Sequence, residues 1–480
     1  MQKIKLIRPI FWLIPILLTS LLLGWLMLTR GHLWGDDFAG YLLQTKSLIN
    51  WNMNSLLEQN RFMNLRSSYS PGPNAYPWGY PLYLLPAYVL VGINPLAFKL
   101  VGLISFLVFL AAFYFLARSK SKEKMAILAT SVMAFSPTLL GLNDLIQSDI
   151  PFLAVSTVCL LLILREESHN SLKNKFAIGM TIFLAVFLRT TGILLFVPYG
   201  VLLLSQKKGM NPKQFLAQSL PIFFFILLYS GQAALFPQGN SSYFEHFGLF
   251  SLNNLLFNLS FYLTLPAKFF VDLPGTVYLA IPLLVFALIY LFKNWKSEYP
   301  LLSFLLVTYL MYSFWPERQG FRFILPVIPV MLLFSVKGID IVSEKLPILK
   351  NPILFFLFFI LVSSLVISGS KGVNNFQNNR EINGPFDPYS FQMYYFVKTE
   401  TNTDDVIVFM KPRALRLFTD RNSFMTTKCD DLIYGDYVSL SLKQEANNQV
   451  SPNSIEECQL PVSFSEVYKN KRFIVYKIEP

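Results

Sequence analysis

Long apolar runs separated by short polar connections make up most of the chain. The first extends from Pro9 to Leu28, and most of the others approach the length of about 20 residues that a helix needs to cross a bilayer. Leu82 to Val91 is too short to cross and is expected near the membrane interface. Together the long runs predict a polytopic α-helical membrane protein with about 11 transmembrane helices. After the first, they cover residues 95–117, 125–142, 149–164, 176–189, 192–205, 214–236, 276–292, 299–314, 323–336 and 352–369.

A polar stretch from Thr29 to Pro81 interrupts the apolar pattern directly after the first run. Because it contains the turn-forming sequence Ser-Pro-Gly-Pro-Asn at 70–74, it cannot cross a bilayer, and we expect a large non-cytoplasmic loop at 29–81. Inside this loop, apolar residues recur at helical spacing between polar ones, which predicts an amphipathic helix lying on the membrane surface. These apolar residues are Phe38, Tyr41, Leu42, Leu48 and Ile49.

The pattern changes again near the C-terminus, where mixed charges and Asn-rich connections replace the apolar runs. Asp387-Pro388 is a typical helix start, and the following residues predict a helix to about Thr399. Val406 to Met410 predicts a strand, and alternation over 462–469 and 472–478 predicts a final hairpin. We therefore expect a membrane domain at 1–370 and a small soluble α/β domain at 371–480.

Composition agrees with a membrane protein. Of the 480 residues, 54% are hydrophobic and only 14% are charged, whereas soluble domains carry about 25% charged residues. The first run resembles a secretory signal peptide, but no small-residue cleavage site follows it. Since it is long enough to cross and many runs follow, we expect it to stay as the first transmembrane helix.

The formal net charge of +12 could indicate that the protein binds nucleic acid, and the positions of the basic residues test this explanation. They gather in short loops on one side of successive runs, which is the pattern of cytoplasmic loops. It predicts a multi-pass protein of the plasma (inner) membrane, with a cytoplasmic N-terminus, an extracytoplasmic C-terminal domain and no nucleic-acid partner. The loops include Arg118 to Lys124, Arg165 to Lys175, Lys207 to Lys213, Lys293, Lys296 and Lys337 to Lys350.

Three cysteines are too few for a disulfide scaffold or a zinc cluster. Cys429 and Cys458 both fall in the domain expected outside the cytoplasm, so the compartment permits a bridge between them, although the sequence does not establish it. No other residues show metal-ligand spacing. We expect no required metal or other cofactor, and a divalent metal is not indicated.

Ionisable residues beside a membrane are costly and therefore mark candidate functional sites. In this chain they collect on the predicted outer side, where acids stand close to arginines. Acids beside arginines at one membrane face suit a reaction in which a carboxylate takes the proton of a hydroxyl and cations stabilise a phosphate leaving group. The candidates are Asp36 and Asp37 after the first run, Asp144 and Asp149 before the fourth, Arg189 after the fifth, Lys268 in a later outer loop, and Glu317, Arg318 and Arg322 before the tenth.

Each candidate also has an explanation without catalysis. Asp36, Asp37 and Asp149 are good helix caps, because Asp accepts hydrogen bonds from the first free N–H groups. Arg189 and Arg322 stand at the ends of apolar runs, where arginines commonly reach lipid headgroups. The aromatic residues at 76–80 could belong to a belt at the membrane interface, where Trp and Tyr are common. The residues alone leave these alternatives open.

In order and position, several segments resemble the GT-C glycosyltransferases, specifically the protein O-mannosyltransferase and lipid A aminoarabinose transferase branch. That branch carries an acidic pair in its first outer loop and an aromatic-proline segment at the start of the next helix. Three later segments are also similar. The matching segments are Trp34-Gly35-Asp36-Asp37-Phe38, residues 76–82 (YPWGYPL), 148–152 (SDIPF), 188–192 (LRTTG) and 322–329 (RFILPVIP).

The resemblance implies a membrane glycosyltransferase of the cell envelope that takes a hexosyl or pentosyl group from a polyprenyl phosphate donor. The acceptor would be a hydroxyl of a lipid, glycan or protein, and the transfer would invert the sugar's configuration. In such a reaction Asp36 or Asp37 is the catalytic base, with Asp36 expected to take the acceptor proton. Asp149 and Asp144 would form an acceptor or second acidic site, and Arg189, Arg322, Arg318 and Lys268 would bind the donor phosphate.

Other functions remain possible on sequence grounds. A transporter or flippase of a lipid-linked sugar would also place charges near the membrane, but it more typically shows internal repeats, which are not evident in this chain. A polymerase or ligase of polyprenyl diphosphate glycans would carry its large outer loop late in the chain. A membrane scaffold would leave the clustered acids and arginines without a role.

The charge pattern makes a direct topological prediction. Reporter fusions after Lys124, Lys208 and Lys350 should report a cytoplasmic location, and fusions after Gly72 and Asn375 should report the opposite side. A cytoplasmic signal after Asn375 would contradict the odd number of crossings.

Overall fold

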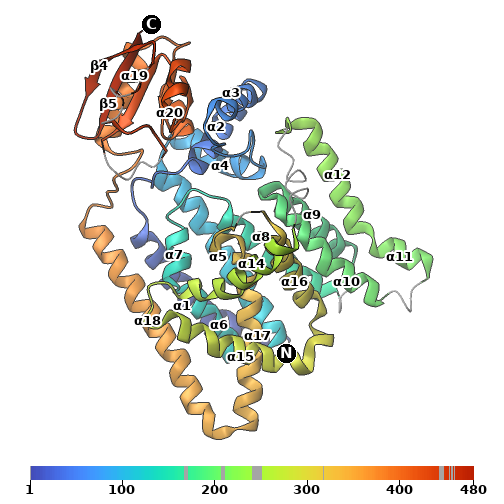
Figure 1. Cartoon of the computed structure of the whole chain (residues 1–480). Helices are drawn as coiled ribbons and strands as arrows, with labels where there is room; N and C mark the ends of the chain where they lie inside the picture. The colour runs from blue at the N-terminus through green and yellow to red at the C-terminus, as the bar shows by residue number, and fades with distance from the viewer. Residues whose placement is uncertain are drawn as a thin grey trace.

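A computed structural model describes residues 2–166, 171–206, 211–239, 251–316, 318–442, 448–452, 455, 458 and 460–479, with the side chains of residues 2–10 left undescribed. Glu317, Lys207 and Lys208, all named above, lie outside these residues. Helices form the first three quarters of the chain, and a mixed sheet domain stands over one end of them (Figure 1).

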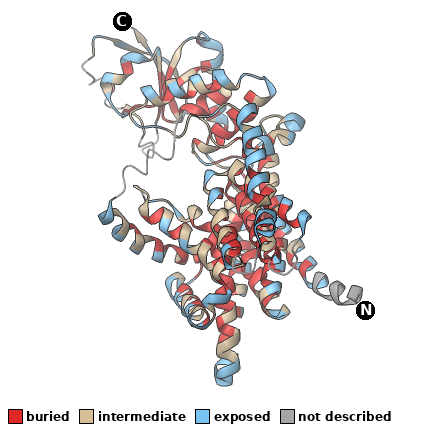
Figure 2. Cartoon of the chain, turned by 90° about the vertical axis from the view of Figure 1, so that its right-hand side faces the viewer, coloured by how far each residue is buried: buried red, intermediate tan, exposed pale blue. Residues whose placement is uncertain are grey.

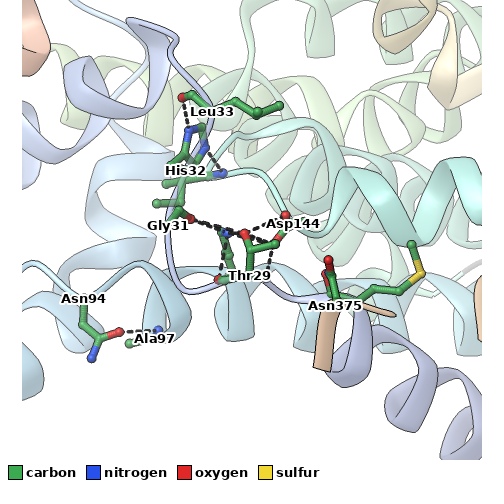
Figure 3. Close-up of polar contacts among 11 residues, drawn as sticks. Thr29, Gly31, His32, Leu33, Asn94, Ala97, Asp144 and Asn375 are labelled. Atoms are coloured by element: carbon green, nitrogen blue, oxygen red, sulfur yellow. Dashed lines mark hydrogen bonds and ion pairs between the residues drawn. The ribbon is translucent and has the colours of Figure 1, made fainter. Parts of the chain in front are cut away.

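The apolar runs fold as helices because each closes its backbone hydrogen bonds within itself, which a bilayer requires. Asn94 begins one of them as an N-cap, since its side chain accepts a hydrogen bond from the N–H of Ala97 (Figure 3). The N-terminal half contains α1 (Gln2–Met27), α2 (Asp37–Ile49), α3 (Met53–Arg66), α4 (Gly79–Val91), α5 (Pro95–Lys120), α6 (Glu123–Ala134), α7 (Pro137–Leu142), α8 (Asp149–Glu166), α9 (Leu172–Leu188), η1 (Thr190–Leu195) and α10 (Phe196–Gln206).

The second group of helices completes the membrane part. Many residues on their outward faces are exposed apolar side chains, as expected for surfaces that contact lipid, whereas buried residues fill the body between the helices (Figure 2). This group contains α11 (Pro212–Gln218), α12 (Leu220–Leu235), α14 (Leu252–Thr264), η3 (Leu265–Phe270), α15 (Thr276–Asn294), η4 (Trp295–Ser297), α16 (Tyr299–Phe314), η5 (Phe321–Phe323), η6 (Leu325–Val327), α17 (Ile328–Lys345), η7 (Pro347–Leu349) and α18 (Lys350–Gln377).

Fewer helices than expected are individually long and apolar enough to cross a bilayer. Within the described ranges, 4 qualify: Pro95–Lys120, Thr276–Ser297, Leu325–Lys345 and Pro347–Gln377. The bent pair α11 and α12, with an angle of 43° between its halves, would make a fifth. One reason is that the single run expected at 125–142 is interrupted at Ser136, where Pro137 starts a new helix. The count of about 11 crossings stays a prediction.

The amphipathic helix expected in the loop at 29–81 exists, and its location at the membrane surface stays a prediction, but its polar face is buried. It is α2, and besides its apolar residues its polar residues Gln44, Thr45 and Ser47 are buried. Protein covers it on several sides, because α2 contacts α3, α4 and the later helix α20 (Pro412–Thr419). The apolar spacing was real, whereas the polar face bonds to protein: the Gln44 side chain donates to the carbonyl of Tyr76 and accepts from its N–H.

The C-terminal domain contains a 5-stranded sheet with strand order β2-β1-β3-β5-β4. The expected helix, first strand and hairpin are all present. β1 pairs in parallel with β2 and β3, and β5 pairs antiparallel with β3 and β4. The elements are α19 (Pro388–Glu400), β1 (Val406–Phe409), α20, β2 (Asn422–Phe424), η8 (Cys429–Tyr434), β3 (Tyr437–Ser441), β4 (Ser463–Lys469) and β5 (Phe473–Glu479).

The sheet domain is fastened to the membrane part by buried contacts. Trp34, just before α2, lies edge-on to Phe409 and Phe473 of the sheet, with ring centroids 5.9 and 6.2 Å away. α20 lies against α2, as Figure 1 shows. A disulfide joins Cys429 to Cys458 within the domain. α18 continues to Gln377, past the boundary expected at 370, so the division into two domains stays a prediction.

Candidate active site

A cavity of about 1090 Å³ opens below the sheet domain, at the end of the helices where the candidate acids and arginines lie. One end is polar, with Asp37, Asp149, Arg189 and Arg322 in its wall. The remainder is lined mainly by apolar side chains of α9, η1, α12 and α16. We call it the main cavity. The apolar lining includes Val186, Leu188, Ile193, Leu194, Phe225, Val307, Leu310, Met311 and Phe323.

Asp37, the first residue of α2, is held by donors from two other segments. Its Oδ1 accepts a hydrogen bond of 2.7 Å from the Tyr76 hydroxyl, and its Oδ2 accepts one of 3.0 Å from Nη2 of Arg322. Burial opposes ionisation of the carboxyl, but the charge of Arg322 and the hydrogen bond from Tyr76 outweigh it, so the pKa of Asp37 is below its ordinary value. Asp37 is therefore an ionised carboxylate in the cavity wall.

A second acid and two arginines complete the polar end. Asp149, in the first turn of α8, accepts a hydrogen bond from Nη1 of Arg189, which follows the last residue of α9. Rings of Phe152 and Phe323 flank the Arg189 guanidinium, with centroids 5.9 and 5.1 Å away. This combination of an ion pair and two rings fixes Arg189 at the cavity.

Arg322 lies between the two acids. Its Nη1 donates to Oε1 of Gln147 at 2.9 Å, in addition to its bond with Asp37. Burial lowers its pKa, but the charges of Asp149 and Asp37 more than compensate, and the net pKa of Arg322 is raised. The side chain of Arg322 keeps 37% of its surface exposed, so its guanidinium is available to a molecule in the cavity.

Asp36 is not among the residues that line the main cavity, and its carboxyl lies near α20. It is buried, and its Oδ1 has no hydrogen-bond partner among the described residues. Burial raises the pKa of Asp36 to about 6, against the opposing charges of Arg413 and Lys411. It also makes no side-chain capping bond to α2, so the capping explanation is not supported. Of the adjacent acids, the structure puts Asp37 in the cavity wall and Asp36 in the domain interface.

Asp144 belongs to a buried polar cluster outside the cavity wall (Figure 3). Its Oδ1 accepts a hydrogen bond of 2.7 Å from Nζ of Lys99, a fully buried lysine of α5. The N–H and hydroxyl of Thr29 also donate to the Asp144 carboxylate. Lys99 donates further to the carbonyls of Thr29 and Gly31, so every member of the cluster is bonded.

His32 adds a further link between the segment after α1 and the segment before α8. Its Nε2 accepts a 3.0 Å hydrogen bond from the N–H of Ile146, which leaves Nδ1 to donate to the carbonyl of Leu33 at 2.8 Å (Figure 3). Burial lowers the pKa of His32 to about 4, so the ring is neutral. The cluster thus fixes the segment after α1 to the segment before α8, and Asp144 has a structural environment.

Two further candidates also lie outside the cavity lining. Arg318 is exposed, with its guanidinium 3.5 Å from the ring centroid of Phe257 on α14, and it donates to the Phe257 carbonyl. Lys268 lies in η3 and is exposed. Arg318 and Lys268 fall, like Arg189 and Arg322, in segments that the sequence predicts on one side of the membrane. Only Arg189 and Arg322 line the main cavity.

Sequence reasoning missed two charged residues, Lys99 and Arg413. Lys99 had a readable signal, a lone lysine inside an apolar run, which requires a partner. Arg413 had none, because its environment exists only once α20 lies against the loop before α4. Nowhere in the described ranges do three His, Cys, Asp or Glu residues stand close enough to hold a metal ion. The expectation that no metal is required stays a prediction.

Comparisons with known proteins identify the relatives of this fold. A sequence model of the Alg9-like mannosyltransferase family matches residues 7–411. Among curated protein sequences, none matches the chain. The similar solved structures include ArnT from Cupriavidus metallidurans in the apo state, with 12% identity over 97% of each chain and a TM-score of 0.62.

The same protein bound to undecaprenyl phosphate matches with 11% identity, 97% coverage of each chain and a TM-score of 0.59. The oligosaccharyltransferase of Archaeoglobus fulgidus tethered with an acceptor peptide matches with 12% identity over 90% of this chain and 69% of that one, with a TM-score of 0.53. At these identities the similarity is one of fold. The fold class expected from the sequence, a GT-C-like helical membrane protein with a small C-terminal sheet domain, is confirmed.

The geometry around Asp144 predicts a loss of stability without a loss of chemistry. Asp144→Asn leaves the buried charge of Lys99 without its anion, which should lower the free energy of unfolding by about 3 kcal/mol. Thermal unfolding in detergent would measure the loss, and the double variant Lys99→Met/Asp144→Asn should recover part of it because no unpaired charge remains. Folded Asp144→Asn protein that is inactive at an unchanged melting temperature would instead favour the second acidic site.

Proposed function

The chain belongs to the Alg9-like mannosyltransferase family, and from this premise we propose that it transfers a sugar from a polyprenyl phosphate donor to an acceptor hydroxyl in the main cavity. Family membership makes the protein a membrane glycosyltransferase and sets aside the transporter and scaffold alternatives. The proposal rests on one observation: the ionised Asp37 and the two arginines Arg189 and Arg322 line the same cavity as a long apolar wall.

Asp37 is the general base of this proposal. It takes the proton of the acceptor hydroxyl as that oxygen bonds to the anomeric carbon of the sugar, while the bond from this carbon to the phosphate oxygen breaks. The products are the glycosylated acceptor and polyprenyl phosphate. Attack from the face opposite the leaving group inverts the anomeric configuration. Asp37 is preferred to Asp36, the residue expected from the sequence, because only Asp37 lines the cavity.

The arginines stabilise the leaving group. A phosphate develops negative charge as the sugar departs, and guanidinium groups bind such oxygens bidentately without losing their protons. Arg322 contacts Asp37 in the structure, so a donor phosphate that draws Arg322 toward itself also frees Oδ2 of Asp37 to accept a proton. Donor binding would in this way activate the base, whereas Arg189 stays fixed by Asp149.

The apolar part of the cavity suits the isoprenoid chain. Ile193 and Leu310 line the cavity and yet are 46% and 49% exposed, so this wall opens toward the outer surface of the helices. A lipid chain can therefore enter sideways from the bilayer while its phosphate stays at the polar end. Among the similar structures, ArnT was solved bound to undecaprenyl phosphate, which has an isoprenoid chain and a phosphate. The archaeal oligosaccharyltransferase was solved with a tethered acceptor peptide.

The orientation follows from the basic loops. The cavity and the sheet domain lie at the end of the helices opposite to Lys120 and Lys350, and the charge rule assigns those lysines to the cytoplasm. Transfer would then occur at the outer face of the inner membrane. A lipid, glycan or protein hydroxyl could be the acceptor, and a hexose or pentose the sugar.

The assignment of the base predicts a sharp difference between adjacent residues. Asp37→Asn preserves the shape of the side chain but cannot take a proton, so turnover should fall by roughly 100-fold to 10,000-fold without a loss of donor affinity. The loss of thermal stability should be small, because Asp37 and Arg322 each keep 37% of their side-chain surface exposed. The matched control is Asp36→Asn, which should keep most of its turnover. The assay follows release of free polyprenyl phosphate and the acceptor mass for a panel of polyprenyl phosphate sugars. Full activity of Asp37→Asn beside an inactive Asp36→Asn would reverse the assignment, and no transfer by the wild type from any donor would refute the function.

The arginines predict a separate effect on the donor. Arg322→Ala and Arg189→Ala should each raise the KM for the donor by about 10-fold or more, because each removes a charge-assisted contact with phosphate. Arg318→Ala serves as the matched control, since it removes an arginine of the same region that lies outside the cavity. Donor kinetics that respond to Arg318 and not to Arg322 would show that the phosphate binds elsewhere.

A further inference from the structure

Arg413 is the point at which the C-terminal domain reaches the active site. It lies in α20 and is only 1% exposed. Its Nη1 donates a hydrogen bond of 2.9 Å to the Tyr76 hydroxyl, and its Nη2 donates one of 2.6 Å to the carbonyl of Pro73. Both Tyr76 and Pro73 line the main cavity. A side chain of the sheet domain therefore holds a segment of the cavity wall.

The hydrogen bonds form a chain with a fixed direction. Arginine can only donate, so the Tyr76 oxygen must accept from Arg413, and the single hydroxyl proton of Tyr76 is then directed to Oδ1 of Asp37. The Tyr76 ring is confined as well, with the Tyr41 ring centroid 4.5 Å away and the Arg413 guanidinium carbon 5.2 Å from its own centroid. Arg413 thus fixes both the position and the polarity of the donor that orients Asp37.

The neighbouring backbone leaves space for this arginine. Gly72 has φ of +148°, a conformation that side chains disfavour, and a Cβ atom there would lie 2.7 Å from Nη1 of Arg413. At Gly40 of α2, a Cβ atom would lie 2.7 Å from the Tyr76 ring and 3.3 Å from Nη1 of Arg413. Two segments of the membrane part are therefore shaped around a residue of the C-terminal domain.

We propose that Arg413 is a positioning residue for sugar transfer and that the C-terminal domain completes the active site by orienting Asp37 through Tyr76. The inference rests on the proposed function, because it takes Asp37 as the base. It assigns to the domain a role in the chemistry itself. An independent acceptor-binding module attached to the membrane part would need no buried arginine bonded to residues of the cavity wall.

Several groups face Asp37 and set its protonation. Besides Tyr76 and Arg413, Arg322 approaches from η5, Tyr41 lies on the same helix and Asp36 is adjacent. The charge of Arg413 lowers the pKa of Asp37. Removing that charge should raise this pKa, so the base becomes ionised only at higher pH, and the acid limb of the activity profile moves upward. The direction is the same whether Arg413 acts through space or through Tyr76.

The experiment compares Arg413→Gln, Arg413→Lys and Tyr76→Phe with the control Arg416→Gln. Arg416 lies on the same helix and is also buried, but its Nη2 donates to Oδ1 of Asn60, away from the cavity lining. In Arg413→Gln the acid limb of kcat/KM should move up by roughly half a pH unit to one unit, and kcat should fall about 10-fold to 100-fold with little change in donor KM. Arg413→Lys keeps the charge, so its acid limb should shift upward by less than that of Arg413→Gln.

A second readout does not depend on turnover. Carbodiimide modifies protonated carboxyl groups, so the pH midpoint of Asp37 labelling, measured by peptide mass spectrometry, reports its protonation directly. The midpoint should move upward in Arg413→Gln and in Tyr76→Phe, and it should stay unchanged in Arg416→Gln even if that variant melts earlier. If Arg413→Gln does not fold, Tyr76→Phe carries the test, because it breaks the chain without altering the domain.

The outcomes separate the two proposals. An unmoved labelling midpoint in folded Arg413→Gln and Tyr76→Phe, or an equal shift in Arg416→Gln, would overturn the positioning role while leaving sugar transfer intact. A shifted midpoint together with wild-type transfer by Asp37→Asn would confirm the contact with Arg413 but refute Asp37 as the base.

Discussion

A charge removed from water at a membrane face is tolerated only when an opposite charge or several hydrogen-bond partners face it. This constraint organises the end of the molecule that holds the main cavity. Asp37 is paired with Arg322, which lies 285 residues later, Asp149 is paired with Arg189, and Lys99 is paired with Asp144. Because each pair joins segments that are distant in sequence, satisfying the charges also brings together the walls of the cavity.

The pairs differ in what they leave available. Lys99 is fully buried and fully bonded, so we expect its pair with Asp144 to hold structure. Asp37 and Arg322 each keep 37% of their side-chain surface exposed and border the cavity, so their contact can be exchanged for contacts with a substrate. The same physical requirement thus produces two kinds of ion pair: Lys99 with Asp144, which holds two segments together, and Asp37 with Arg322, which can take part in a reaction. The two pairs differ in how deeply they are buried and in whether they border the cavity.

The C-terminal domain adds two buried arginines to this end of the molecule. Arg413 and Arg416 are buried where α20 meets the membrane part, and each donates a hydrogen bond to a residue of the loop between α1 and α4. The domain is therefore anchored by polar contacts in addition to the packing of Trp34 against the sheet. Part of the loop expected outside the membrane, including α2, thus lies between the membrane part and the C-terminal domain.

The sequence predicted much of the fold, because apolar runs long enough for a bilayer leave the chain few alternatives to helices. It also located the acids and arginines at one end. It could not decide between Asp36 and Asp37, since successive residues of a helix point about 100° apart and only the tertiary structure shows which direction holds the cavity. It predicted an amphipathic helix for α2 but not the burial of its polar face, because spacing reveals an apolar face but not what covers the polar one. Arg413 was beyond its reach for the same reason.

We propose that a lipid phosphate binds at Arg322 and Arg189 with its chain along the apolar wall of the main cavity. A cryo-electron microscopy structure of the protein with undecaprenyl phosphate would show whether it does. We expect phosphate density within hydrogen-bonding distance of Arg322, with the isoprenoid chain passing Ile193 and Leu310. Lipid density confined to another surface, with the Arg322 to Asp37 contact unchanged and the cavity empty, would contradict it.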